Sequence, residues 1–191
     1  MLTQFFRSIN WVDVALLVLF VRTVFISVTT GFVAEVFKFL GLVTAIFVGS
    51  HYYAFAAEFL AKKTSLPLAG LRFLVFTVLV CAAILVFKFA RDGISLLFKV
   101  ETNHQGFDKY GAGVLGAVRG WLLCSTVLFA VFLVPHPLVH RQAFSSWGHK
   151  VAARAAPDTY SFLFHQVIGK LFESQKFNAD VFTVVSGQSK I

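Results

Sequence analysis

Residues 108–123 read Asp108-Lys-Tyr-Gly-Ala-Gly-Val-Leu-Gly-Ala-Val-Arg-Gly-Trp-Leu-Leu123 and combine a charge pair, several small residues and the start of an apolar segment. On an α-helix the small residues recur every four positions and form one smooth face, made of Ala112, Gly116, Gly120 and Cys124. A second helix can approach such a face closely in a membrane. Arg119 lies beside this face, about 10 Å along the helix from Ala112, too deep for an ordinary lipid-facing cation. The segment therefore predicts a membrane helix that needs a helical partner, and a counter-charge or water for Arg119.

The composition of the whole chain also indicates a membrane protein. Of its 191 residues, 58% are hydrophobic and only 14% are charged, and the mean hydropathy is +0.78. A soluble domain fills its core with far fewer apolar residues. The net charge of +8 does not indicate nucleic-acid binding, because the basic residues mostly flank apolar runs. We expect the lipid bilayer as the environment and no nucleic acid among the partners.

Four apolar runs define the predicted architecture, an all-α polytopic membrane protein with four transmembrane helices and a C-terminal amphipathic helical tail. The runs cover about residues 12–30, 31–58, 71–90 and 112–134, each long enough to cross a bilayer core of roughly 30 Å. The membrane domain accordingly comprises residues 1–136 and the tail residues 137–191. Within the tail, apolar positions at helical spacing from Tyr160 onward predict an amphipathic helix that lies on the membrane or against the bundle.

The connections and small residues predict how these helices pack. Residues 29–31 leave almost no loop, so we expect the first two helices to form an antiparallel hairpin. In the second helix, small residues again recur at four-residue spacing, at Gly41, Ala45 and Gly49. The two smooth faces predict that the second and fourth helices cross there.

Two further segments are expected near the lipid headgroups. His51, Tyr52 and Tyr53, at the end of the second helix, are typical of an interfacial belt. Lys88 and Arg91 lie on the polar side of a helix that continues beyond the third span, and residues 101–106 then predict a polar turn.

Glu35 is the first candidate partner for Arg119. It lies in the first turns of the second helix, where it could simply complement the helix dipole. The sharper hypothesis is an ion pair with Arg119, because both residues would lie toward the same membrane side in a four-span topology. Asp108 and Lys109, at the start of the fourth helix, are further candidates for a structural or functional role.

Asp13 and Arg22 are the other charged candidates, both inside the first apolar run. After Asn10 as helix N-cap, Asp13 would lie in the first turn and complement the dipole. The functional alternative is an intramembrane proton or ion site, which is suggested by the position of both Asp13 and Arg22 inside the apolar run. The two residues are about 14 Å apart along one helix, so they are not partners on that helix.

No catalytic, cofactor-binding or metal site is predicted. Cys81 and Cys124 lie inside apolar runs and are interpreted as small fillers. His136 and His140 are one helical turn apart, but no Glu or Cys completes a metal site beside them. The chain also carries no nucleophile elbow, phosphate-binding loop or zinc-hydrolase motif, and we expect no enzymatic activity.

Two motifs resemble the signature stretches of the CvpA (colicin V production protein) family: Gly31-Phe32-x-x-Glu35-x-x-x-x-Leu40-Gly41 and Asp108-Lys109-x-x-Ala112-x-x-x-Gly116-x-x-Arg119-Gly120. The resemblance covers about residues 11–134 and leaves the tail outside. It implies a small bacterial inner-membrane protein with four spans, linked to colicin V production or export and to envelope maintenance, without an established chemical activity. In some relatives a similar four-helix unit carries a periplasmic serine protease domain, which this chain lacks.

The chain departs from the family pattern at several positions. The family usually has a basic residue where Ala34 stands, Arg for Lys109, Gly for Ala112, and an Arg-Gly pair where this chain has Ile26-Ser27. The missing charges leave the orientation open. Weighting the basic residues close to the spans slightly favours a cytoplasmic location for the first and third loops, with both termini outside.

Two classes of function fit these observations. The favoured one is a non-enzymatic inner-membrane accessory or scaffold protein that supports colicin V-like toxin production or export, or envelope homeostasis, through a membrane protein partner or as a homo-oligomer. The alternative is a small transporter or channel subunit with a polar path along Asp13, Arg22, Glu35 and Arg119. Four spans without a duplicated half favour the first class. Charges used in ion pairs or directed to the interface would also favour the scaffold, whereas a water-filled path would favour transport.

Overall fold

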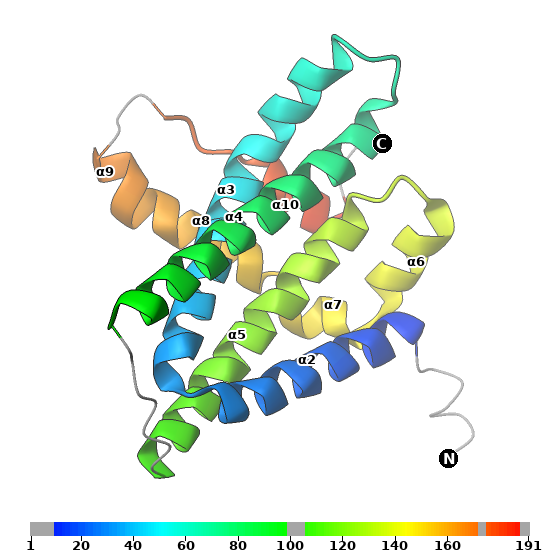
Figure 1. Ribbon diagram of the computed structural model, residues 1–191. Helices are drawn as coiled ribbons and strands as arrows, with labels where there is room; N and C mark the ends of the chain where they lie inside the picture. Colours follow the sequence, from blue (N-terminus) through cyan, green and yellow to red (C-terminus); the bar gives the residue numbers. More distant parts are fainter. Residues whose placement is uncertain (1–9, 99–105, 172–174, 188–191) are drawn as a thin grey trace, which may run out of the picture.

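The computed structural model of the chain describes residues 10–98, 106–171 and 175–187, and no strand occurs within these ranges. Four long helices form the bulk of the molecule (Figure 1): α2 (Trp11–Thr30), α3 (Phe32–Ala61), α4 (Leu68–Phe98) and α5 (Gly106–Phe132). Shorter segments follow: α6 (Pro137–Ser145), α7 (Trp147–Ala152), α8 (Ala155–Leu163), the π-helix η1 (Phe164–Ile168), α9 (Gly169–Leu171) and α10 (Asp180–Val185). The predicted all-α class is confirmed. The polar turn expected at residues 101–106 lies outside the described residues, except for Gly106 at the start of α5.

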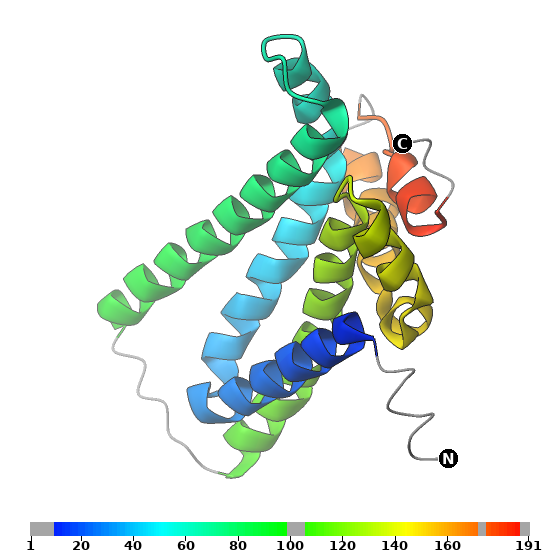
Figure 2. The ribbon, with the colours of Figure 1, turned by 90° about the vertical axis from the view of Figure 1, so that its right-hand side faces the viewer.

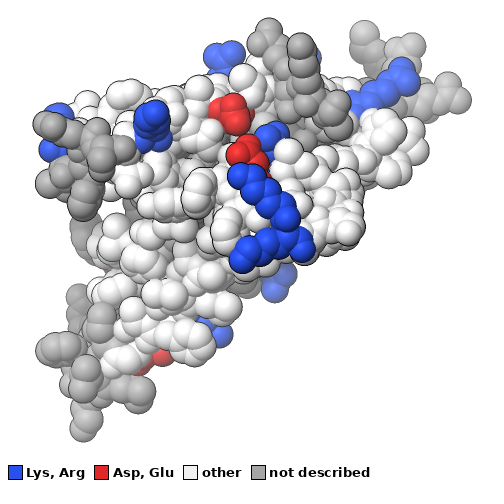
Figure 3. All heavy atoms as spheres, turned by 90° about the horizontal axis from the view of Figure 1, so that it is seen from above, with Lys and Arg blue, Asp and Glu red and all other residues white. Residues whose placement is uncertain are grey.

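Each long helix contains a segment long and apolar enough to cross a membrane. These segments are Trp11–Thr30, Phe32–Ala61, Leu68–Gly93 and Asp108–Phe132, close to the predicted runs. Large apolar side chains cover their outer surfaces, among them Leu17, Phe25, Phe55, Phe89 and Val114. Seen from the end that carries the α3–α4 turn, the described surface is mostly uncharged; one group of Lys and Arg side chains lies beside acidic ones near the centre, and other basic side chains lie toward the edges (Figure 3). An outer surface of this kind belongs in lipid, and the fold is that of a membrane protein.

A single residue, Gly31, joins α2 to α3. Its φ of +88° is a left-handed backbone conformation in which a residue with a side chain would be strained. One residue spans at most about 3.6 Å, whereas the axes of two packed helices lie about 8–10 Å apart. The two helices therefore diverge from the junction and share few contacts (Figure 2). The tight junction is present, but the predicted antiparallel hairpin of the first two helices is wrong.

Helix α2 packs along α5 instead, and the glycines of α5 allow the close approach. A β-carbon on Gly116 would collide with the Cβ and Oγ atoms of Ser27. One on Gly120 would lie 3.1 Å from the ring of Phe20 and 3.5 Å from the methyl group of Thr23. The smooth face predicted from residues 112–124 therefore has a helical partner, and that partner is α2.

The glycines of α3 face α4 in the same way. A β-carbon on Gly41 would lie 2.8 Å from the Phe87 Cβ, and one on Gly49 would lie 2.8 Å from the Val80 Cγ2. The predicted crossing of the second and fourth helices through their small faces is therefore wrong. The short turn after α3 returns the chain as α4 directly alongside it, so α4 occupies the glycine face that would otherwise be open to α5. The alanines of the two stripes, Ala45 and Ala112, are fully buried.

The C-terminal helices pack against the membrane helices, which is one of the two positions expected for the tail. Ser125 of α5 accepts the Ala156 N–H at 2.8 Å, and its hydroxyl lies 3.4 Å from the Ala153 carbonyl oxygen. On α3, the Ser50 carbonyl accepts the side-chain N–H of Asn178 at 2.8 Å. The tail is thus hydrogen-bonded to both α3 and α5.

Tyr160 fixes α8 to α3 through its hydroxyl group. The oxygen accepts the Asn178 N–H at 3.0 Å and lies 3.1 Å from the His51 Nδ1. Burial raises the pKa of Tyr160, although the Asn178 N–H partly opposes this shift, so the hydroxyl keeps its proton. The hydroxyl can then donate to the His51 Nδ1, while the His51 Nε2 carries the ring proton and faces the Gln175 Oε1 at 3.1 Å.

The expected interfacial belt at the end of the second helix is only partly present. Tyr52 is exposed, but His51 lies against the tail, and Tyr53 is fully buried. The Tyr53 ring packs edge-on against Phe76 and Phe129, with ring centroids 6.1 and 5.8 Å away. Sequence position alone could not separate these residues, because adjacent helical residues point about 100° apart and face different neighbours.

Replacing Gly116 with alanine is expected to destabilise the protein in detergent, because Ser27 occupies the space of the new methyl group. Overpacking of this kind costs about 1–3 kcal/mol, which thermal unfolding of the purified variant measures. Gly93→Ala is the matched control, since nothing lies within 4 Å of a β-carbon there. That variant should be neutral or stabilised by up to about 1 kcal/mol. Unchanged stability of Gly116→Ala would contradict the packing of α2 on α5.

Candidate functional site

Glu35 is a carboxylate inside the helix bundle, with 0% of its surface exposed. It lies in the first turn of α3, where the free N–H groups of the helix end favour a negative charge. The dipole of one helix end contributes only about 0.3–2 kcal/mol, whereas a buried ion costs several kcal/mol. Glu35 therefore needs cations or hydrogen-bond donors from its neighbours.

Two cations flank the Glu35 carboxylate. The Lys38 Nζ lies 2.6 Å from Oε1, the Arg119 Nε lies 2.9 Å from Oε2, and the Arg119 Nη2 lies 3.5 Å from Oε1. The Nε contact is a charge contact rather than an aligned hydrogen bond, since neither atom has a hydrogen-bond partner among the described residues. The structure thus brings Glu35 and Arg119 together, as the ion-pair hypothesis requires, and adds Lys38 to the pair.

Helix α2 supplies two hydroxyl groups to the same cations. The Ser27 Oγ lies 3.3 Å from the Arg119 Nη2, and the Thr30 Oγ1 accepts from the Lys38 Nζ at 3.1 Å. Sequence reasoning missed both residues. The signal was present, because Thr23, Ser27 and Thr30 recur at helical spacing and form a polar stripe on an apolar helix.

Asp108 links the start of α5 to the start of α3 through a hydrogen bond. Its Oδ1 accepts the backbone N–H of Phe32 at 2.9 Å, one of the N–H groups that a helix end leaves without an intrahelical partner. Lys109 is exposed and forms no salt bridge with any other described residue. Of this charge pair, only Asp108 therefore contributes to the site.

Asp13 and Arg22 lie away from this site. The carboxylate of Asp13 accepts the backbone N–H groups of Trp147 and Gly148 at 3.1 and 2.8 Å, so it holds the first turn of α7. Arg22 is exposed on the outer face of α2, and no carboxylate of the described chain lies within ion-pair distance of it. Of the four charges of the hypothetical polar path, Glu35 and Arg119 come together, whereas Asp13 and Arg22 lie apart from them.

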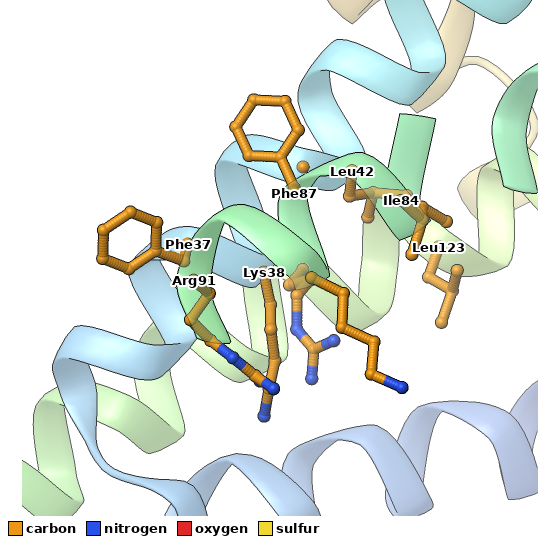
Figure 4. Close-up of a pocket in the computed structure, with 10 residues that line it drawn as sticks. Phe37, Lys38, Leu42, Ile84, Phe87, Arg91 and Leu123 are labelled. Carbon is orange, nitrogen blue, oxygen red and sulfur yellow. The ribbon is translucent and has the colours of Figure 1, made fainter. Parts of the chain in front are cut away.

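A pocket of about 260 Å³ opens beside the ion pair, between α3, α4 and α5. Four basic side chains line it, together with apolar ones: Lys38, Lys88, Arg91, Arg119, Phe37, Leu42, Ile84, Phe87 and Leu123. Lys38 and Arg91 come from different helices and extend toward the same side of the pocket (Figure 4). The sequence pattern puts Lys88 and Arg91 on a polar helix face, but it gives no sign of their proximity to Arg119, because no local pattern shows which helices meet.

The histidines and cysteines form no metal site in the described parts of the chain, where no group of three or more His, Cys, Asp or Glu side chains could hold an ion. The His140 Nε2 lies 3.1 Å from the Phe132 carbonyl oxygen. Cys124 is buried, with its Sγ 3.5 Å from the Leu16 carbonyl oxygen, and Cys81 is exposed on α4.

These observations define a helical membrane protein in which cations from two helices share one buried carboxylate. The chain belongs to the Colicin V production protein family, whose sequence profile matches residues 12–157. The match continues past the fourth long helix into α8, beyond residue 134, where the resemblance was expected to end. The colicin V production protein of Escherichia coli K12 is 28% identical over 120 residues, which cover 62% of this chain and 72% of that relative. No solved structure matches the chain.

Replacing Glu35 with glutamine is expected to lower the free energy of unfolding in detergent by about 3–5 kcal/mol, because Arg119 would lose its buried counter-charge. Arg119→Gln should lower the free energy of unfolding by a similar amount. The double variant should lose clearly less than the sum of the two single losses. Chemical unfolding of all four proteins gives this coupling energy. Glu58→Gln is the control, since the exposed Glu58 lies 3.9 Å from Arg72 and its loss should cost at most about 1 kcal/mol. Additive losses at Glu35 and Arg119 would contradict the pairing.

Proposed function

We propose that this chain is a non-enzymatic, multi-pass accessory or scaffold protein of the bacterial inner membrane. In this role it supports the production or export of a colicin V-like toxin, or the homeostasis of the cell envelope. Membership of the Colicin V production protein family supports a role in colicin V production, and the name of the E. coli relative points to the same process. The four apolar helices support a multi-pass position in the membrane.

The observation that carries the scaffold role is the way the buried charges are used. Glu35 is neutralised by Lys38 and Arg119, and Asp13 accepts hydrogen bonds from two backbone N–H groups of α7. A transport path needs charged groups that remain available to a passing solute. The acidic groups of the hypothetical path instead hold helices together, which favours a fixed structural unit over a transporter.

The outer face of α2 supports a membrane protein partner. Arg22 is exposed there beside large apolar side chains, since Val18, Val21 and Phe25 are 60%, 57% and 70% exposed. An arginine near the middle of a span costs about 2.5–3.5 kcal/mol on insertion scales. A carboxylate on another membrane protein, or on a second copy of this chain, would remove this cost. We therefore place the partner contact on this face.

The test is rescue of toxin release in an E. coli strain that carries the colicin V genes and lacks its own colicin V production protein. The wild-type chain is expected to restore the zone of growth inhibition around producing colonies, and Glu35→Gln to fail at matched abundance. Glu58→Gln should behave as wild type, because Glu58 lies outside the site. Failure of the wild-type chain at normal membrane abundance would contradict the proposed role.

The same strain allows the partner contact to be mapped. A photo-crosslinking residue at position 21 should capture a membrane protein or a second copy of the chain, and Arg22→Leu should abolish this product. The same probe at position 55, an equally apolar position on α3, is the control. Capture at neither position would argue against a scaffold, and solute flux through the purified protein in vesicles would establish the transporter alternative.

A further inference from the structure

We propose that the pocket between α3, α4 and α5 binds a phosphate-type anion, carried either by a phospholipid headgroup or by a free phosphate. Lys38, Lys88, Arg91 and Arg119 line this pocket. The site is independent of the proposed role in toxin production.

The charge balance of the pocket favours an anion. Three of its four cations are paired, Lys38 and Arg119 with Glu35 and Arg91 with Asp92, so the four positive charges outnumber these two carboxylates by two. The Glu35 carboxylate is already shared between Lys38 and Arg119. In a pocket with mainly apolar walls, charges of one sign repel each other more strongly than in water. A bound anion would relieve this repulsion.

Several N–H donors around the pocket are not used by the protein. An ammonium group has three donors, and Lys38 directs two of them to Glu35 and Thr30. Arg119 directs its Nε and Nη2 toward Glu35 and Ser27, and its Nη1 forms no hydrogen bond or ion pair with another described residue. Lys88 is exposed, with no carboxylate among the described residues within ion-pair distance. These free donors match a group with several acceptor oxygens, such as a phosphate.

The size and position of the pocket fit the headgroup region of a lipid. Its volume of about 260 Å³ is far larger than the roughly 10–15 Å³ that one water molecule requires. Its α3 residues lie in the first three turns of that helix and its α4 residues in the last turns of the span Leu68–Gly93, while Arg119 comes from the middle of the span in α5. Apolar side chains such as Phe37, Ile84 and Phe87 line the pocket together with the basic ones, and the charged ends of Lys38 and Arg91 extend away from the Phe37 and Phe87 rings (Figure 4). Basic pockets between membrane helices recognise anionic headgroups in this way.

The test is a calorimetric titration of the full chain, purified in a neutral detergent. The probes are dihexanoyl phosphatidylglycerol, dihexanoyl phosphatidylcholine and inorganic phosphate. We expect phosphatidylglycerol, phosphate or both to bind, with phosphatidylcholine much weaker. Lys88→Gln/Arg91→Gln should raise the Kd by about tenfold or more, because two of the cations are lost. The matched control is Lys62→Gln/Lys63→Gln, which removes the same charge from the α3–α4 turn and should leave the Kd unchanged.

The outcomes separate the sources of the anion. Phosphatidylglycerol binding more tightly than phosphate assigns the site to a lipid headgroup, and comparable or tighter binding of phosphate assigns it to a free anion. Equal binding of phosphatidylcholine and phosphatidylglycerol, unchanged binding by the pocket variant, or no binding of either anion would overturn the proposal. Melting curves and the single variants Lys88→Gln and Arg91→Gln distinguish a lost site from a misfolded chain, since neither residue contacts Glu35.

Discussion

A carboxylate cut off from water has to be neutralised by its neighbours, and Glu35 imposes this requirement on three helices. Its own helix provides Lys38 one turn away, α5 provides Arg119, and hydroxyl groups of α2 hold both cations in place. The Gly31 junction and the contact between Asp108 and the start of α3 bring the ends of these helices together. The ion pair of Glu35 and these two contacts together set how α3 and α5 are aligned along their lengths.

The two stripes of small residues act differently from the Glu35 ion pair, because each stripe lets one pair of helices pack closely. Gly116 and Gly120 bring α2 onto α5, while Gly41 and Gly49 bring α4 onto α3. Between these two pairs, α3 and α5 meet through the ion pair at one level and through aromatic side chains such as Tyr53 and Phe129 at another. The bundle remains open beside the ion pair, which leaves the basic pocket between α3, α4 and α5.

Local patterns in the sequence predicted much of this structure. Apolar runs gave the four long helices, and the spacing of small residues identified the faces along which helices pack closely. The helix that packs against each glycine face could not be predicted from local patterns. Many helices can pack against such a face, and the connections between the helices determine which one does. For the same reason Lys88 and Arg91 were not connected with Arg119. Asp13 was placed correctly in a first turn, but its contact with α7, more than a hundred residues away, has no local signal.

The two glycine stripes serve different helix pairs, so that α3 and α5 meet through Glu35 and Arg119. Disulfide crosslinking in membranes tests it directly, with Cys81 and Cys124 replaced by alanine. Cysteines at positions 28 and 113 should form a rapid crosslink, since a β-carbon on Gly113 lies 3.3 Å from the Val28 Cγ2. Cysteines at positions 41 and 116 should form none. A crosslink between 41 and 116, with none between 28 and 113, would show that the glycine stripes of α3 and α5 face each other and would contradict the account.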